Sequence, residues 1–213
     1  MLNRFWLVVS AVWLGLVAGA AVYAADEGSS ANALRETLAA TTSLTGEFEQ
    51  TLRDAEGEPI ESSAGHFVLQ RPGRFFWHTR QPFEQQLISD GNTIWLYDPD
   101  LMQVTVRPVT DELNNTPAAL LSESAESLAE AFLITRSVGQ QGRVVFGLTP
   151  VDKDSLFARL ELEFDAKNLQ RIVVHDSLGQ TTEFKLTNTE RNQPVDATQF
   201  TFSAPEGVDV LID

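Results

Sequence analysis

The chain has 213 residues, no cysteine and a formal net charge of −15 at pH 7. This negative charge repels phosphate backbones and anionic membrane surfaces, so we do not expect a nucleic-acid partner. Without cysteine the chain has no disulfide, no thiol nucleophile and no attachment site for an N-terminal lipid anchor. The length suits one medium-sized domain with a sizeable core.

The first 24 residues predict a secretory signal peptide. Arg4 precedes an apolar run over residues 5–22, and small or short residues precede the expected cleavage site after Ala24. A retained membrane anchor is the alternative, because the run is nearly long enough to span a bilayer. Cleavage would leave residues 25–213 with a net charge of −16. We expect this part to form a single domain, monomeric and located in the periplasm.

The chain then changes from a helical period to a strand period. Leu34 and Leu38 lie four residues apart and predict a short helix over residues 30–44. Alternation of apolar and polar residues follows and predicts strands. These strands cover residues 44–52, 64–70 and 74–79, a hairpin over 85–98, and residues 101–109, where Pro108 should end the pairing.

Residues 111–137 interrupt this pattern with helical spacing. Pro117 is placed to begin a helix, and Leu121, Leu128 and Phe132 follow at helical intervals. The polar residues 122–127 should divide the region into two short helices. Strands are expected again at residues 142–150, 157–168, 169–176, 181–188 and 199–203. The sequence therefore predicts a mainly β fold, a single strongly curved antiparallel sheet of about 11 strands covered by short α-helices.

Motifs for catalysis, metal binding or cofactor binding are missing from the sequence. His66, His78 and His175 are widely separated, and neither a Gly-x-Ser-x-Gly turn nor a Gly-rich phosphate loop occurs. We therefore expect no enzyme, no metal and no cofactor. Large apolar side chains on many strands instead favour a curved sheet with a partly filled concave face that could take an apolar ligand.

Residues 67–82, FVLQRPGRFFWHTRQP, interleave positive charge with aromatic rings. Such interleaving is typical of nucleic-acid binding, but strand alternation separates the two kinds of side chain. Phe75 and Trp77 should share one face, while Arg74, Phe76 and His78 share the other. The segment is therefore not expected to form one mixed platform.

Several segments, in their order and spacing, resemble the outer-membrane lipoprotein carrier (LolA) family. They are RPGRFFWHTRQP at 71–82, LISDGNTIWLYDPDLMQV at 87–104, NTP at 115–117 and VDATQFTFSAPEGV at 195–208. The resemblance runs over nearly all of residues 25–213 and implies an unclosed β-barrel with a lid of short helices.

The resemblance also implies a shuttle with three kinds of partner. Members of the family accept triacylated lipoproteins from an inner-membrane Lol ABC transporter, carry them across the periplasm and pass them to the outer-membrane receptor LolB. The alternative is a periplasmic lipid- or glycolipid-binding protein, or a lipoprotein sensor, on the same scaffold.

Functional residues can be carried over from the family where its motifs match. Arg71 matches the arginine that hydrogen-bonds the backbone of the lid in the closed, empty form. The lid segment would include Asn115, Thr116, Pro117, Leu120 and Leu121. The acyl-chain cavity, from family aromatic positions and strand alternation together, would be lined by Phe48, Phe67, Leu69, Phe75, Trp77 and Trp95.

Overall fold

The computed structural model describes residues 27–109, 116–139, 142–155 and 157–212. Within these, one sheet of 12 strands has the order β12-β6-β5-β4-β3-β2-β1-β11-β10-β9-β8-β7. The strands are β1 (Ser43–Arg53), β2 (Pro59–Gln70), β3 (Arg74–Gln81), β4 (Gln85–Asp90), β5 (Thr93–Asp98), β6 (Gln103–Pro108), β7 (Phe132–Val138), β8 (Val144–Pro150), β9 (Phe157–Asp165), β10 (Asn168–Asp176), β11 (Thr181–Arg191) and β12 (Asp209–Ile212).

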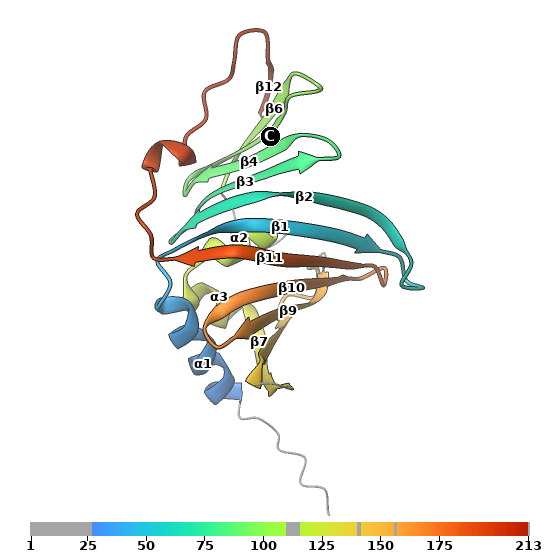
Figure 1. Ribbon diagram of the computed structural model, residues 1–213, viewed down its shortest axis with the longest axis vertical. Helices are drawn as coiled ribbons and strands as arrows, with labels where there is room; N and C mark the ends of the chain where they lie inside the picture. The colour runs from blue at the N-terminus through green and yellow to red at the C-terminus, as the bar shows by residue number, and fades with distance from the viewer. Residues whose placement is uncertain (1–26, 110–115, 140–141, 156, 213) are drawn as a thin grey trace, which may run out of the picture.

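The sheet is strongly curved and unclosed (Figure 1), with β12 and β7 as its two edges. Neighbouring strands pair antiparallel throughout, except that β12 pairs parallel with β6. Short turns join most neighbours in the chain, so each strand returns beside the one before it. The expected fold class is thus confirmed, and the two edge strands, β7 and β12, are ones that the sequence did not predict.

Three helices lie on the concave side of the sheet. They are α1 (Glu27–Ala39), α2 (Pro117–Ser122) and α3 (Ala125–Ala131), and Figure 1 shows α2 and α3 behind the strands. Leu34, Leu38, Leu120, Leu121 and Leu128 are all at most 4% exposed and pack into the same apolar core as the strands. The core therefore lies between the concave face and these helices.

The first of the two short helices in the middle of the chain begins at Pro117, where the sequence predicts a helix start. Thr116 caps α2 by accepting a hydrogen bond from the Ala119 amide, and Ser124 caps α3 through the Ser127 amide. The polar residues between them end the first helix and start the second. This division confirms the prediction of two helices.

Two predictions of local structure are wrong. Phe132 ends α3 and starts β7, where Phe132 and Ile134 are buried and Leu133 is exposed, because this segment alternates with period two. Residues 199–203 form no strand in the structure. The Asp196 carboxylate accepts from the Thr198 amide and caps a 3-10 turn, η3 (Ala197–Phe200), which buries Phe200 against β3 and β4.

The expected signal peptide, residues 1–24, lies outside the described residues. None of the described helices is long and apolar enough to cross a membrane.

Candidate functional site

Aromatic rings form the middle of the concave face. Trp77 stacks on Phe48 at 4.3 Å between ring centroids and on Phe67 at 5.3 Å. Phe184 meets the edge of the same indole at 5.6 Å. These rings come from β1, β2, β3 and β11, and the register places Phe67 directly opposite Trp77. The structure therefore brings four strands' aromatic side chains into one apolar wall.

Five of the six predicted cavity residues share this wall. Phe75 pairs with Leu69 on β2, one alternation step from the pair of Phe67 and Trp77. All four side chains and Phe48 are at most 7% exposed and belong to one core cluster. The prediction that Phe75 and Trp77 share a face is confirmed by this register.

Trp95 lies on the other face of the sheet, so its prediction as a cavity residue is wrong. Trp95 pairs with Ile88, and Ile88 pairs with Phe76, whereas Trp77 pairs with Leu87. Because directly paired residues point to the same side, Trp95 is on the face of Phe76. The convex side of this part of the sheet is covered by the chain after β11, where Phe202 contacts Tyr97 at 5.2 Å.

Gly65 makes room for the rings. A Cβ atom on this residue would lie 1.9 Å from the carbonyl oxygen of His78 and 2.8 Å from the Phe48 ring. Gly65 pairs with Phe48 on β1 and with Thr79 on β3. Only glycine permits this approach, since any larger residue would displace the backbone or the ring.

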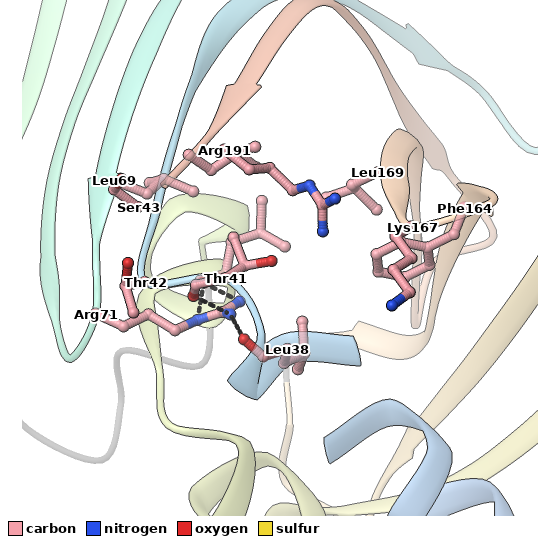
Figure 2. A pocket seen from close by; sticks show the side chains of 12 residues that line it. Leu38, Thr41, Thr42, Ser43, Leu69, Arg71, Phe164, Lys167, Leu169 and Arg191 are labelled. Atoms are coloured by element: carbon pink, nitrogen blue, oxygen red, sulfur yellow. Dashed lines mark hydrogen bonds between the residues drawn. The ribbon is translucent and has the colours of Figure 1, made fainter. Parts of the chain in front are cut away.

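Arg71 connects α1 and α2 to the sheet. Its Nε and Nη2 atoms donate to the Leu121 carbonyl at 3.0 and 2.8 Å. Its Nη1 donates to the Leu38 carbonyl at 2.6 Å and to the Thr41 carbonyl at 3.1 Å. Figure 2 shows the guanidinium reaching toward the end of α1. One planar fork thus holds the C-terminal ends of both α1 and α2.

The positive charge of Arg71 suits this position. The last carbonyls of a helix have no partner within the helix and carry the negative end of its dipole. Burial lowers the pKa of Arg71 to about 10, so the guanidinium still carries its charge near neutral pH. Within the described residues its acceptors are all neutral carbonyls, so the charge is met by helix ends and not by a carboxylate.

The turn that carries Arg71 is itself fixed by hydrogen bonds. The Ser89 hydroxyl, fully buried, donates to the Gly73 carbonyl at 2.9 Å and accepts from the Gly91 amide at 3.1 Å. The Gly73 amide donates to the Ser122 carbonyl at 2.9 Å. The turns before β3 and before β5 are therefore tied to each other and to the end of α2.

The structure describes four of the five predicted lid residues, and all four lie at or in α2. Thr116 is the N-cap of α2, Pro117 is its first residue, and Leu120 and Leu121 are 1% and 2% exposed. Asn115 lies outside the described residues. Sequence reasoning missed that α1 is held by the same arginine, because the carbonyls of Leu38 and Thr41 carry no residue-specific signal.

Little space remains under α1 and α2, the helices that the Arg71 hydrogen bonds hold to the sheet; we call these hydrogen bonds the latch. A pocket bordered by Leu38, Leu69, Arg71 and Leu121 has a volume of about 20 Å³, which is room for about one water molecule (Figure 2). A larger pocket of about 320 Å³ opens beside Trp77 and the start of α2. The concave face is thus filled near Arg71 and hollow farther along β3.

Charged side chains on the convex side form surface ion pairs. On the convex side of β9–β11, Glu163 contacts Arg143 at 2.9 Å and Arg171 at 3.1 Å. Within the described part of the chain, no group of three or more His, Asp or Glu residues could hold a metal ion. Such partly exposed pairs contribute little to stability and suggest no chemistry.

Comparisons with known proteins agree on one family. The family model described as outer membrane lipoprotein carrier protein LolA matches residues 39–203. An outer-membrane lipoprotein carrier protein of Pseudomonas aeruginosa PAO1 is 41% identical over 197 residues, covering 92% of this chain and 94% of that protein. That of Chromohalobacter salexigens is 40% identical over 181 residues, covering 85% and 86%.

Solved structures include one of the same fold. An uncharacterized conserved protein from Thermus thermophilus superposes with a TM-score of 0.53 at 14% identity. The match covers 88% of this chain and all of that protein. At this identity the likeness concerns the fold alone.

Proposed function

The chain belongs to the outer-membrane lipoprotein carrier (LolA) family, and we propose that it holds the acyl chains of a lipoprotein between the concave face of its sheet and the helices latched by Arg71. The family consists of transport proteins and not of enzymes. The cargo would be triacylated lipoproteins, received from an inner-membrane Lol ABC transporter and delivered to LolB. The setting of this transfer would be the periplasm.

The observation that carries the proposal is that one arginine joins both helices over an apolar wall. The wall supplies aromatic and aliphatic carbon from most strands of the sheet. The 20 Å³ pocket under α1 and α2 is too small for an acyl chain, so these helices would have to part before a chain could extend beneath them from the 320 Å³ hollow beside Trp77. Opening would break the hydrogen bonds from Arg71 to Leu38, Thr41 and Leu121 and the bond from the Gly73 amide to the Ser122 carbonyl.

Complementation tests the proposal. Cells depleted of their own carrier should again deliver lipoproteins to the outer membrane when they express the full chain. Mass spectrometry of the purified protein should find triacylated polypeptide bound to it. Free lipid without polypeptide, together with failed complementation, would contradict the carrier function and favour a lipid-binding protein.

A further inference from the structure

Positive charge gathers in one pocket beside the latch, although the chain as a whole is strongly acidic. The side chains of Arg71, Lys167 and Arg191 come from three separate segments and line the same pocket. Among the described residues that line it, none is an aspartate or glutamate. In a chain with a net charge of −15, such a pocket is a local site of positive potential.

Two of these cations are available to a ligand. Arg191 ends β11 and pairs with Leu44, which places its side chain on the concave face, and Lys167 lies exposed in the turn before β10. Figure 2 shows both side chains bordering the space near Leu169 and Phe164. In the described part of the chain, neither cation has an ion pair or side-chain hydrogen bond.

The rest of the pocket is apolar. Leu44, Leu69, Leu169 and Phe164 line it, and all four belong to the core cluster that continues along the concave face. Cations at the outer side of an apolar pocket match a molecule with an anionic head and a hydrocarbon tail. A purely polar anion would leave the apolar lining unused, and a neutral chain would leave the cations unpaired.

We propose that Arg191 and Lys167, at the outer side of this pocket, bind the anionic headgroup of an acyl-chain amphiphile, with the chain directed toward the concave face. The proposal rests on the proposed function for the destination of the chain, whereas recognition of the anion is its own claim. In the latched form the small pocket leaves no room for the chain. The headgroup therefore meets Arg191 and Lys167 before α1 and α2 move apart.

Two amphiphiles with the same chain and phosphate group test the anion preference. Dodecyl phosphate carries a net negative head, whereas choline neutralises the head of dodecyl phosphocholine. Calorimetry below micelle-forming concentrations should show dodecyl phosphate binding about tenfold more tightly, because a hydrogen bond to a charged group is worth roughly a factor of ten in affinity. Added salt should reduce this preference.

Three variants test which residues cause the preference for dodecyl phosphate. Arg191→Gln and Lys167→Gln should each weaken binding of dodecyl phosphate more than binding of dodecyl phosphocholine, which brings the two affinities closer together. Lys185→Gln is the matched control, because Lys185 lies exposed on the same strand, β11, and alternates to the opposite face from Phe184. It should keep the full preference.

The outcomes separate the two claims. Equal binding of both amphiphiles, or a preference that survives in Arg191→Gln and Lys167→Gln, would overturn the headgroup site and leave the carrier function standing. Inorganic phosphate binding as tightly as dodecyl phosphate would overturn the role of the chain at this site. Binding of neither amphiphile would contradict the proposed function as well.

Discussion

Replacing Arg71 by leucine should release α1 and α2 while leaving the sheet intact. Leucine keeps part of the hydrocarbon stem but removes the hydrogen bonds to Leu38, Thr41 and Leu121. Those carbonyls can bind water once the helices move, so no buried polar group is left without a partner. The closed arrangement then lacks the hydrogen bonds that join α1 and α2 to Arg71. We therefore expect local opening and not global unfolding.

The size of the effect follows from two opposing contributions. A hydrogen bond to a charged donor contributes about 2 kcal/mol, so three carbonyls supply roughly 6 kcal/mol. Burial of the charge opposes this, because lowering the pKa of Arg71 from its ordinary value to about 10 corresponds to roughly 3 kcal/mol. The difference of about 3 kcal/mol predicts that opening becomes roughly a hundredfold more favourable.

Amide hydrogen exchange measures this opening directly. In Arg71→Leu the amides of α1 and α2 should exchange about a hundredfold faster, and those of β9 and β10 should keep their protection. Arg74→Leu is the control, since Arg74 lies exposed in the same segment and on the opposite face from Phe75. Unchanged exchange in α1 and α2 of Arg71→Leu would refute the latch.

Four further substitutions test the aromatic wall and the pH dependence of stability. Gly65→Ala should cost about 1–3 kcal/mol in urea denaturation, because its Cβ would overlap backbone and the Phe48 ring, whereas a stability equal to wild type would mean that the strands adjust freely. Trp77→Ala should weaken binding of dodecyl phosphocholine, and Trp95→Ala, on the opposite face, should not; equal losses would argue against the concave face as the binding surface. Burial lowers the pKa of His66 below 6.5, so the unfolded chain takes up a proton at higher pH than the folded one. The contribution of neutral His66 to stability is therefore full above pH 6.5 and is lost as the pH falls through that value toward the folded-state pKa. His66→Gln should make stability depend less on pH in this range. An unchanged pH dependence would contradict the lowered pKa of His66.

The alternation of side chains along one strand could be predicted from the sequence. Which residues of distant strands share a face of the sheet could not. Phe75 and Trp77 are two residues apart, so their common face follows from the pleat alone. Whether Trp95 joins them depends on the register across β4, where Ile88 and not Leu87 stands opposite Trp95. A shift of one residue reverses every side chain, and only the hairpin geometry decides it.

Interactions through the backbone were equally inaccessible to sequence reasoning. The family resemblance implied that Arg71 contacts the lid, yet it did not identify the carbonyls of Leu38 in α1 and of Thr41 just after it. Any residue offers the same carbonyl, so the composition of α1 gives no sign of this contact. Similarly, Phe132 fits a helical period from Leu128, and only its place opposite Pro150 shows that it begins a strand.

In the proposed carrier function, the strength of the hydrogen bonds made by Arg71 would set how readily cargo leaves. Burying acyl chain contributes about 0.8 kcal/mol per methylene, so several long chains could approach the practical limit of affinity near roughly −20 kcal/mol. If closing the empty protein is worth about 3 kcal/mol, this amount is subtracted from the binding free energy, and net affinity falls by roughly a hundredfold. Arg71→Leu should therefore accept lipoprotein at least as well as wild type but pass it to LolB much more slowly. Lysine should restore delivery only in part, because a single ammonium lacks the planar fork that reaches three carbonyls. Normal delivery by Arg71→Leu would mean that release is governed by the receptor and not by the latch.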